Sequence, residues 1–181
     1  LNVAEGRHIN PLSKVFLEAG RECGLPLNSD FNGPEQEGVG YYQVTQKHGM
    51  RCSSAKAFLA PVMRRSNLTV MTQTQATGIG LVDGRAVSLN VVQSGSRQAL
   101  RCRQEIILCG GAVNSPHLLM LSGIGPREEL QKHHIPVRHQ LPGVGQNLQD
   151  HLDTTVMIHD TTAQSIGLSL LALPRMIADV L

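Results

Sequence analysis

The spacing of apolar residues near the start of the chain predicts a helix. Four apolar residues recur at intervals of three and four, which places them on one helical face: Leu12, Val15, Phe16 and Ala19. Asn10 is suited to the N-cap, and Pro11 to the first helical turn, where its missing N–H costs nothing. Gly20 or Gly24 is expected to end this helix.

Residues 25–50 break that periodicity and predict a long loop. They are rich in Gly, Pro, Asn and Asp, and irregular segments of this length usually carry function or belong to a larger fold. A second short helix is predicted from Ser53 or Ser54 to Met63.

From Asn67 onward the pattern takes the period of β-strands. Four short β-prone runs follow one another: "NLTVMT", "ATGIGLV", "AVSLNVV" and "ALRCR". Asp83-Gly84 and Ser94-Gly95-Ser96 are hairpin turn signals. Residues 67–103 therefore predict a small antiparallel meander.

Residues 105–109, "EIILC", form a continuous apolar run, which is typical of a strand buried on both faces. The run leads into Gly110-Gly111 and then into a predicted helix with Ser115 as N-cap and Pro116 at the first position. A further helix is expected in "PREELQKHH", and then a loop followed by a strand. Together these elements predict an α+β (mixed α/β) fold, in which a meander and one buried central strand pack with short helices.

Composition indicates an ordinary soluble globular protein. The 181 residues are 41% hydrophobic and 17% charged, and 16 basic against 14 acidic residues give a net charge of +2. This balance gives no reason to expect binding to nucleic acid. No run of about 18 apolar residues predicts a membrane span. Four cysteines without a C-x-x-C pair or a secretory signal favour reduced thiols and a cytoplasmic location.

Both ends of the chain suggest a segment of a longer protein. It begins "LNVAEG" without an initiator Met and stops at "RMIADVL", inside an apolar helical pattern without a cap.

The stretch "CGGAVNSPHLLMLSGIG", residues 109–125, is the strongest candidate for a ligand site. A strand, a Gly-Gly turn and a helix would point free N–H groups at whatever lies above the turn. The glycines would let a nucleotide or another backbone approach closely. These features alone leave a nucleotide site and simple strand-to-helix packing equally open.

Other motifs are weaker. Gly143-Val144-Gly145 lacks the third glycine of G-x-G-x-x-G, and Gly78-Ile79-Gly80 has no helix after it. Five histidines fall late in the chain: His133, His134, His139, His151 and His159. His133 and His134 would project about 100° apart on a helix, so no metal site is expected. Asp150 or Asp153 could orient His151 for proton transfer, but local structural hydrogen bonding is the preferred interpretation.

Several motifs in order resemble one enzyme family. "GGAVNSPHLLMLSGIGP" followed by "LPGVGQNLQDH" closely resembles a signature and the following turn of the glucose–methanol–choline (GMC) oxidoreductases. "DFNGPEQEGVG", "RCSSAKAFLAPVMRRSNLTVMT" and "DGRAV" are similar to the choline dehydrogenase branch of that family. The resemblance covers nearly the whole chain and is weaker after about residue 155.

The resemblance implies an FAD flavoenzyme that oxidises an alcohol to an aldehyde or ketone. Hydride would pass to the flavin while a histidine base takes the hydroxyl proton. Residues 1–66 would supply substrate-side helices and the long loop, 67–152 part of the FAD-binding domain, and 153–181 the start of a substrate-binding domain. For a full-length enzyme of this family, the resemblance also leaves open association with a membrane and assembly into a homo-oligomer.

The same resemblance assigns cofactor contacts to four residues. Ala76 matches the position whose backbone meets the adenine, and Cys109, Gly110 and Gly111 match the turn beside the adenosine. Ser115 would cap the helix as a structural residue.

The family's pyrophosphate-binding G-x-G-x-x-G and its catalytic histidine have no counterpart in this sequence, so no catalytic residue is assigned. The segment alone is expected to be inactive and to hold FAD weakly or not at all. The alternative is a stand-alone, non-catalytic module that binds a ligand or partner.

Overall fold

The computed structural model describes residues 1–7 and 9–157. These residues form two compact units, one built from Leu1–Thr69 with residues 155–157 and the other from Val70–Thr154. The predicted substrate-domain start at 153–181 and His159 therefore lie largely or wholly outside the described residues. No helix within the described residues has the length and apolar content needed to cross a bilayer.

The first unit opens with the predicted helix, α1 (Pro11–Glu22). Asn10 is the N-cap, and its side-chain oxygen accepts a hydrogen bond from the Leu12 N–H (2.8 Å). The helix forms as predicted, and on its apolar face Val15 and Phe16 are 64% and 66% exposed. Helical spacing marks a face that can be buried, but no described segment covers these two side chains.

The long loop contains a two-residue hairpin, β1 (Gln46–Lys47) with β2 (Met50–Arg51). Its turn residues, His48 and Gly49, both have positive φ, at 53° and 75°. Asn28 organises the earlier part of the loop, because its side-chain amide donates to the carbonyl of Glu35 (2.8 Å).

The second predicted helix forms in the expected place with a different geometry. A π-helical turn, η1 (Ala55–Leu59), continues into a 3₁₀ turn, η2 (Ala60–Val62). Pro61 lies in η2 and has no N–H to donate, which disfavours a regular α-helix at this point.

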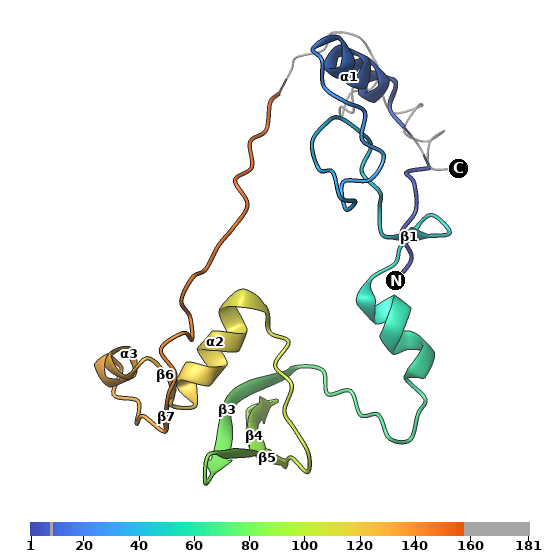
Figure 1. The fold of residues 1–181 in the computed structure, drawn as a ribbon. Coiled ribbons are helices and arrows are strands. Elements are labelled where there is room, and N and C mark those ends of the chain that lie inside the picture. The colour runs from blue at the N-terminus through green and yellow to red at the C-terminus, as the bar shows by residue number, and fades with distance from the viewer. Residues whose placement is uncertain (8, 158–181) are drawn as a thin grey trace. The chain divides into compact units, whose positions relative to one another are not determined.

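The second unit holds the predicted meander (Figure 1). Strands β3 (Thr74–Val82), β4 (Arg85–Gln93) and β5 (Ser96–Arg101) form one antiparallel sheet in the order β3-β4-β5. Both hairpin turns are confirmed: Asp83-Gly84 and Ser94-Gly95 each carry two positive φ angles, which matches the right-handed twist of the flanking strands.

Two predicted strands are wrong. Residues 67–72 and 105–109 pair with no other strand in the described part of the chain. Ile107, in the middle of the second run, is 73% exposed. A strand buried on both faces needs a neighbour along its edge and layers above and below it, and no described segment supplies them. The predicted strand at the end of the chain is also wrong over residues 149–157, which are irregular.

Two helices follow the sheet. Helix α2 (Gly111–Leu121) contacts β3. Strands β6 (Ile124–Gly125) and β7 (His139–Gln140) pair in parallel, and α3 (Arg127–Lys132) connects them along the chain. Leu130 is the most deeply buried side chain among the described residues, at 1% exposure. The mixed α/β prediction is confirmed, with a small antiparallel sheet and short helices.

Candidate functional site

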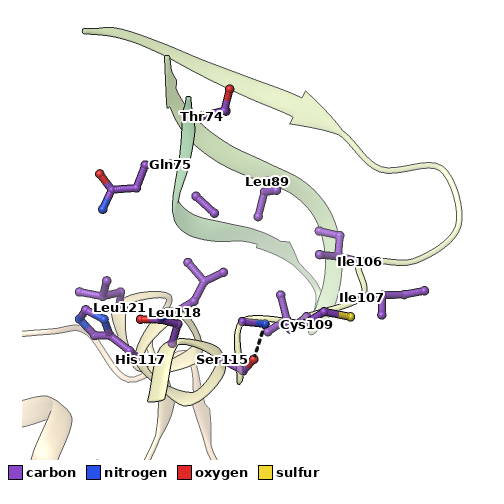
Figure 2. Close-up of a pocket in the computed structure, with 14 residues that line it drawn as sticks. Thr74, Gln75, Leu89, Ile106, Ile107, Cys109, Ser115, His117, Leu118 and Leu121 are labelled. Atoms are coloured by element: carbon purple, nitrogen blue, oxygen red, sulfur yellow. Dashed lines mark hydrogen bonds between the residues drawn. The ribbon is translucent and has the colours of Figure 1, made fainter. Parts of the chain in front are cut away.

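A cavity of about 550 Å³ lies in the second unit between the sheet and α2 (Figure 2). Three segments contribute its walls: the start of β3 with Leu89 of β4, the irregular residues 106–110, and one side of α2. The cavity brings together Ala76, Cys109 and Gly110, three of the four residues for which the sequence predicted cofactor contacts.

Ala76 lies on β3, at the edge of the three-stranded sheet. The register between β3 and β4 shifts between Ala76 and Gly78, as in a β-bulge. A bulge bends the strand and changes where its backbone points, and such irregularities are common beside binding sites. The half-buried Ala76 therefore offers a small side chain and a locally irregular backbone to the cavity.

The two glycines of the turn have different roles. Gly110 lines the cavity, and its N–H donates to the Ser115 hydroxyl oxygen (3.0 Å). A Cβ on Gly110 would lie 3.0 Å from the Cβ of Asn114, so the turn packs closely against α2. Gly111 does not line the cavity; it has a φ of +81°, which turns the chain into the helix.

The predicted start of α2 is wrong. The helix begins at Gly111, five residues earlier than expected, with Gly110 as its N-cap. Pro116 lies inside the helix, where it cannot donate to the carbonyl of Ala112. Ser115 is consequently in the second turn, and its hydroxyl reaches back to the Gly-Gly turn instead of capping a following helix.

The contribution of α2 itself was not predicted from the sequence. His117, Leu118 and Leu121 line the cavity, and Figure 2 shows Leu118 on the side of α2 that faces the sheet. Together with Asn114, these residues recur at intervals of three and four along the helix. A predicted helix that began at Gly111 would therefore have placed all four residues on one face. Ile106, Ile107 and Leu108, predicted to form a buried strand, form another wall.

The described lining of the cavity combines aliphatic side chains with uncharged polar groups and one histidine. No Lys, Arg, Asp or Glu is among its described lining residues; its polar groups are those of Thr74, Gln75, Asn114, Ser115, Cys109 and His117. Aliphatic walls with a few hydrogen-bonding groups suit a flat, uncharged ring. No Lys or Arg side chain among the described lining residues is present to pair with a phosphate, and the N–H of Gly110, the N-cap of α2, already donates to Ser115.

Two of the remaining candidates, His133 and His151, make local contacts. Glu129 contacts both Lys132 (3.0 Å) and His133 (3.2 Å), and its hydrogen bond to Lys132 lowers the pKa of the Glu129 carboxyl. The Asp150 carboxylate accepts from the backbone N–H of His151 (2.9 Å). Within residues 1–7 and 9–157, no three His, Cys, Asp or Glu side chains gather as a metal would require.

Comparison with known proteins identifies the family. Residues 1–153 match the GMC oxidoreductase family. The chain is 48% identical over 177 residues to an alcohol dehydrogenase [acceptor] of Pseudomonas putida, covering 97% of this chain and 32% of the relative. It is 46% identical over 156 residues to the mitochondrial choline dehydrogenase of Mus musculus, covering 86% of this chain and 26% of the relative.

Solved structures agree in fold. An FAD-dependent oxidoreductase from Chaetomium thermophilum superposes with a TM-score of 0.77 at 28% identity, over 82% of this chain and 26% of its own. Pyridoxine 4-oxidase from Mesorbium loti superposes with a TM-score of 0.73 at 33% identity, over 77% of this chain and 28% of its own. The chain thus spans about a quarter to a third of the length of the relatives it matches. With a family match over most of its length and these structural neighbours, the chain belongs to the GMC oxidoreductases.

Proposed function

We propose that this chain forms the adenosine side of the FAD site in a GMC enzyme that oxidises an alcohol to an aldehyde or ketone. The relatives' names, an alcohol dehydrogenase and choline dehydrogenases, support an alcohol as the substrate class. The structural neighbour from Chaetomium thermophilum is an FAD-dependent oxidoreductase, which supports FAD as the cofactor.

The observation that carries the proposal is the shared cavity of Ala76, Cys109 and Gly110. These residues come from two separate segments, and the fold brings both to the wall of one hollow that lies within a single unit. The aliphatic side chains of Leu89 and Leu118 could lie against an adenine ring, and the side-chain amide of Gln75 or Asn114 could reach its polar edge.

The cavity also explains which part of FAD it would not hold. A pyrophosphate group carries negative charge, and none of the described lining residues is a Lys or Arg. A G-x-G-x-x-G motif in a strand–turn–helix setting, the usual pyrophosphate site, does not occur in the sequence. We therefore assign the pyrophosphate contacts to parts of the enzyme that correspond to the remaining length of its relatives.

The chemistry is divided in the same way. FAD, when bound, would accept a hydride from the substrate carbon. The residues of this chain would bind and orient the adenosine end, and none of them is assigned to remove the hydroxyl proton. The 181-residue chain alone is accordingly expected to be catalytically inactive and to hold FAD weakly or not at all.

Filling the cavity tests the assignment of Ala76. In the protein made from the complete reading frame, Ala76→Phe should place a ring where the adenine would lie and lower FAD affinity at least about tenfold. Ala86→Phe is the matched control, because Ala86 is a half-buried alanine of the adjacent strand β4 that does not line the cavity. Flavin content per protein, measured by absorbance, reports the result.

Equal flavin content in Ala76→Phe and in the parent protein would contradict the placement of adenosine in this cavity. An equal loss of flavin in Ala86→Phe would show that both substitutions disturb the sheet and that neither reports on the cavity.

A further inference from the structure

A second cavity, of about 520 Å³, lies in the first unit and has a basic lining. The β1–β2 hairpin contributes Lys47, His48 and Arg51, and the adjoining helical turn η1 contributes Lys56. No Asp or Glu is among the described residues that line this cavity.

Backbone contacts hold the segments that carry these exposed basic residues close to one another. Lys47 and Met50 are paired across the hairpin, so the turn His48-Gly49 is as tight as a hairpin allows. The Cys52 N–H, directly after β2, donates to the carbonyl of Thr45 (2.8 Å), and Cys52 is buried. Only Ser53 and Ser54 separate that anchor from η1, so the hairpin and Lys56 are held close together.

The basic side chains of the cavity have no acidic partner among the described residues, as is also true of Lys14 on α1. Within the described part of the chain, Lys47, Arg51 and Lys56 form no ion pair, whereas Arg21 and Lys132 pair with glutamates on their own helices. The polar contact of the Lys56 ammonium is the thioether of Met50 (3.9 Å). Grouped like charges repel one another, and a bound anion would relieve this repulsion.

A fifth basic residue lies beside the turn. A Cβ built on Gly49 would be 3.0 Å from the guanidinium of Arg7, so this side chain lies against the hairpin. The nearby carboxylate of Glu5 is engaged elsewhere, since it accepts a hydrogen bond from the side chain of Gln43 (2.9 Å).

We propose that this basic cavity binds the phosphate group of a small molecule. Arginine and lysine together suit a multiply charged oxyanion, since the guanidinium offers a planar pair of donors and the ammonium a point charge. Met50, Ala57 and Pro61 add apolar surface beside the charges, which can contact the organic part of a phosphate ester. A concave site with buried Cys52 in its wall favours a small ligand over a flat membrane surface.

Titration of the 181-residue chain at low ionic strength tests the proposal. Inorganic phosphate and glycerol 3-phosphate should each give saturable amide shifts confined to residues 46–57 in ¹H–¹⁵N spectra. Arg51→Gln and Lys56→Gln should each weaken binding about tenfold, as expected for the loss of a charge-assisted hydrogen bond. Lys14→Gln, at a lysine on α1 without an ion pair among the described residues, is the control and should bind as the parent does.

The proposal fails if the shifts do not saturate or if Lys14→Gln weakens binding as much as the cavity variants do. It also fails if the chain binds phosphatidylserine vesicles but neither soluble phosphate, because that result would identify a membrane-facing surface. Unchanged amide signals of α1, which belongs to the same unit as the cavity but does not line it, exclude misfolding of that unit as the cause of lost binding.

Discussion

A single buried hydroxyl joins the sheet to α2 beside the candidate adenosine cavity. Ser122 is 6% exposed. Its Oγ accepts from the N–H of Ile79 on β3 (2.8 Å), and its hydroxyl donates to the carbonyl of Leu118 in α2 (2.6 Å). Ile79 is itself buried, so without Ser122 the N–H of this edge strand would lose its partner.

Removing that hydroxyl should destabilise the second unit. Ser122→Ala leaves the Ile79 N–H buried and unpaired, which costs about 1–3 kcal/mol. Urea unfolding followed by the amide signals of β3 measures the loss. Ser96→Ala, at an exposed serine of β5, should change the free energy of unfolding by less than about 0.5 kcal/mol. Equal effects of both substitutions would refute the role of the hydrogen bond.

The backbone angle of Gly111 supports a second prediction at this scale. Gly111→Ala puts a Cβ at a φ of +81°, which should cost about 1–2 kcal/mol although the space around it is open. Hydrogen exchange at the start of α2 should become faster. Gly143→Ala is the matched control, because its surroundings are equally open and its φ is not positive. Strain is the wrong explanation if both variants behave alike.

Among the elements, α3 carries a surface charge cluster with a defined pH dependence. The hydrogen bond and charge of Lys132 lower the pKa of Glu129, and Glu129 raises the pKa of Lys132. A lowered carboxyl pKa stabilises the folded state above the ordinary glutamate value, and this contribution is lost as the pH falls through the folded pKa. The side chains of Lys132 and Glu129 are 69% and 44% exposed to solvent, so salt should weaken the effect.

The pH dependence can be measured on Glu129→Gln. Its unfolding midpoint should lie below that of the parent at neutral pH, and the two should converge as the pH is lowered through the folded pKa of Glu129. Glu22→Gln, at a glutamate without an ion pair in the described residues, is the control and should show a smaller difference. A difference that persists unchanged in strong acid would rule out the carboxylate as its source.

Local signals predicted local elements. Asp83-Gly84 and Ser94-Gly95 predicted both hairpins, because turn chemistry acts within a few residues. Residues 105–109 were assigned to a buried strand on hydrophobicity alone, and that assignment required neighbours that no described segment provides. The start of α2 was misplaced because Pro116 resembles a first-turn residue, whereas the Gly-Gly turn begins the helix earlier.

In the whole molecule, the candidate site was predictable only in part. Resemblance to family motifs predicted four cofactor-contacting residues. The fold places three of them, Ala76, Cys109 and Gly110, around one cavity, whereas Gly111 does not line it. The contribution of α2 depends on where the helix begins, which periodicity did not show. The basic cavity depends on a hairpin hidden in a loop whose polar composition gives no strand signal.

The central claim is that this chain supplies one side of an FAD site whose other side and catalytic base lie elsewhere in the enzyme. The most direct test compares flavin absorbance of the protein from the complete reading frame with that of residues 1–181 alone. We expect bound FAD in the protein from the complete reading frame, and its flavin absorbance should fall when an alcohol is added in the absence of oxygen. We expect little or no bound FAD in residues 1–181 alone. Stoichiometric FAD on the 181-residue chain, or a complete protein without flavin, would contradict the claim.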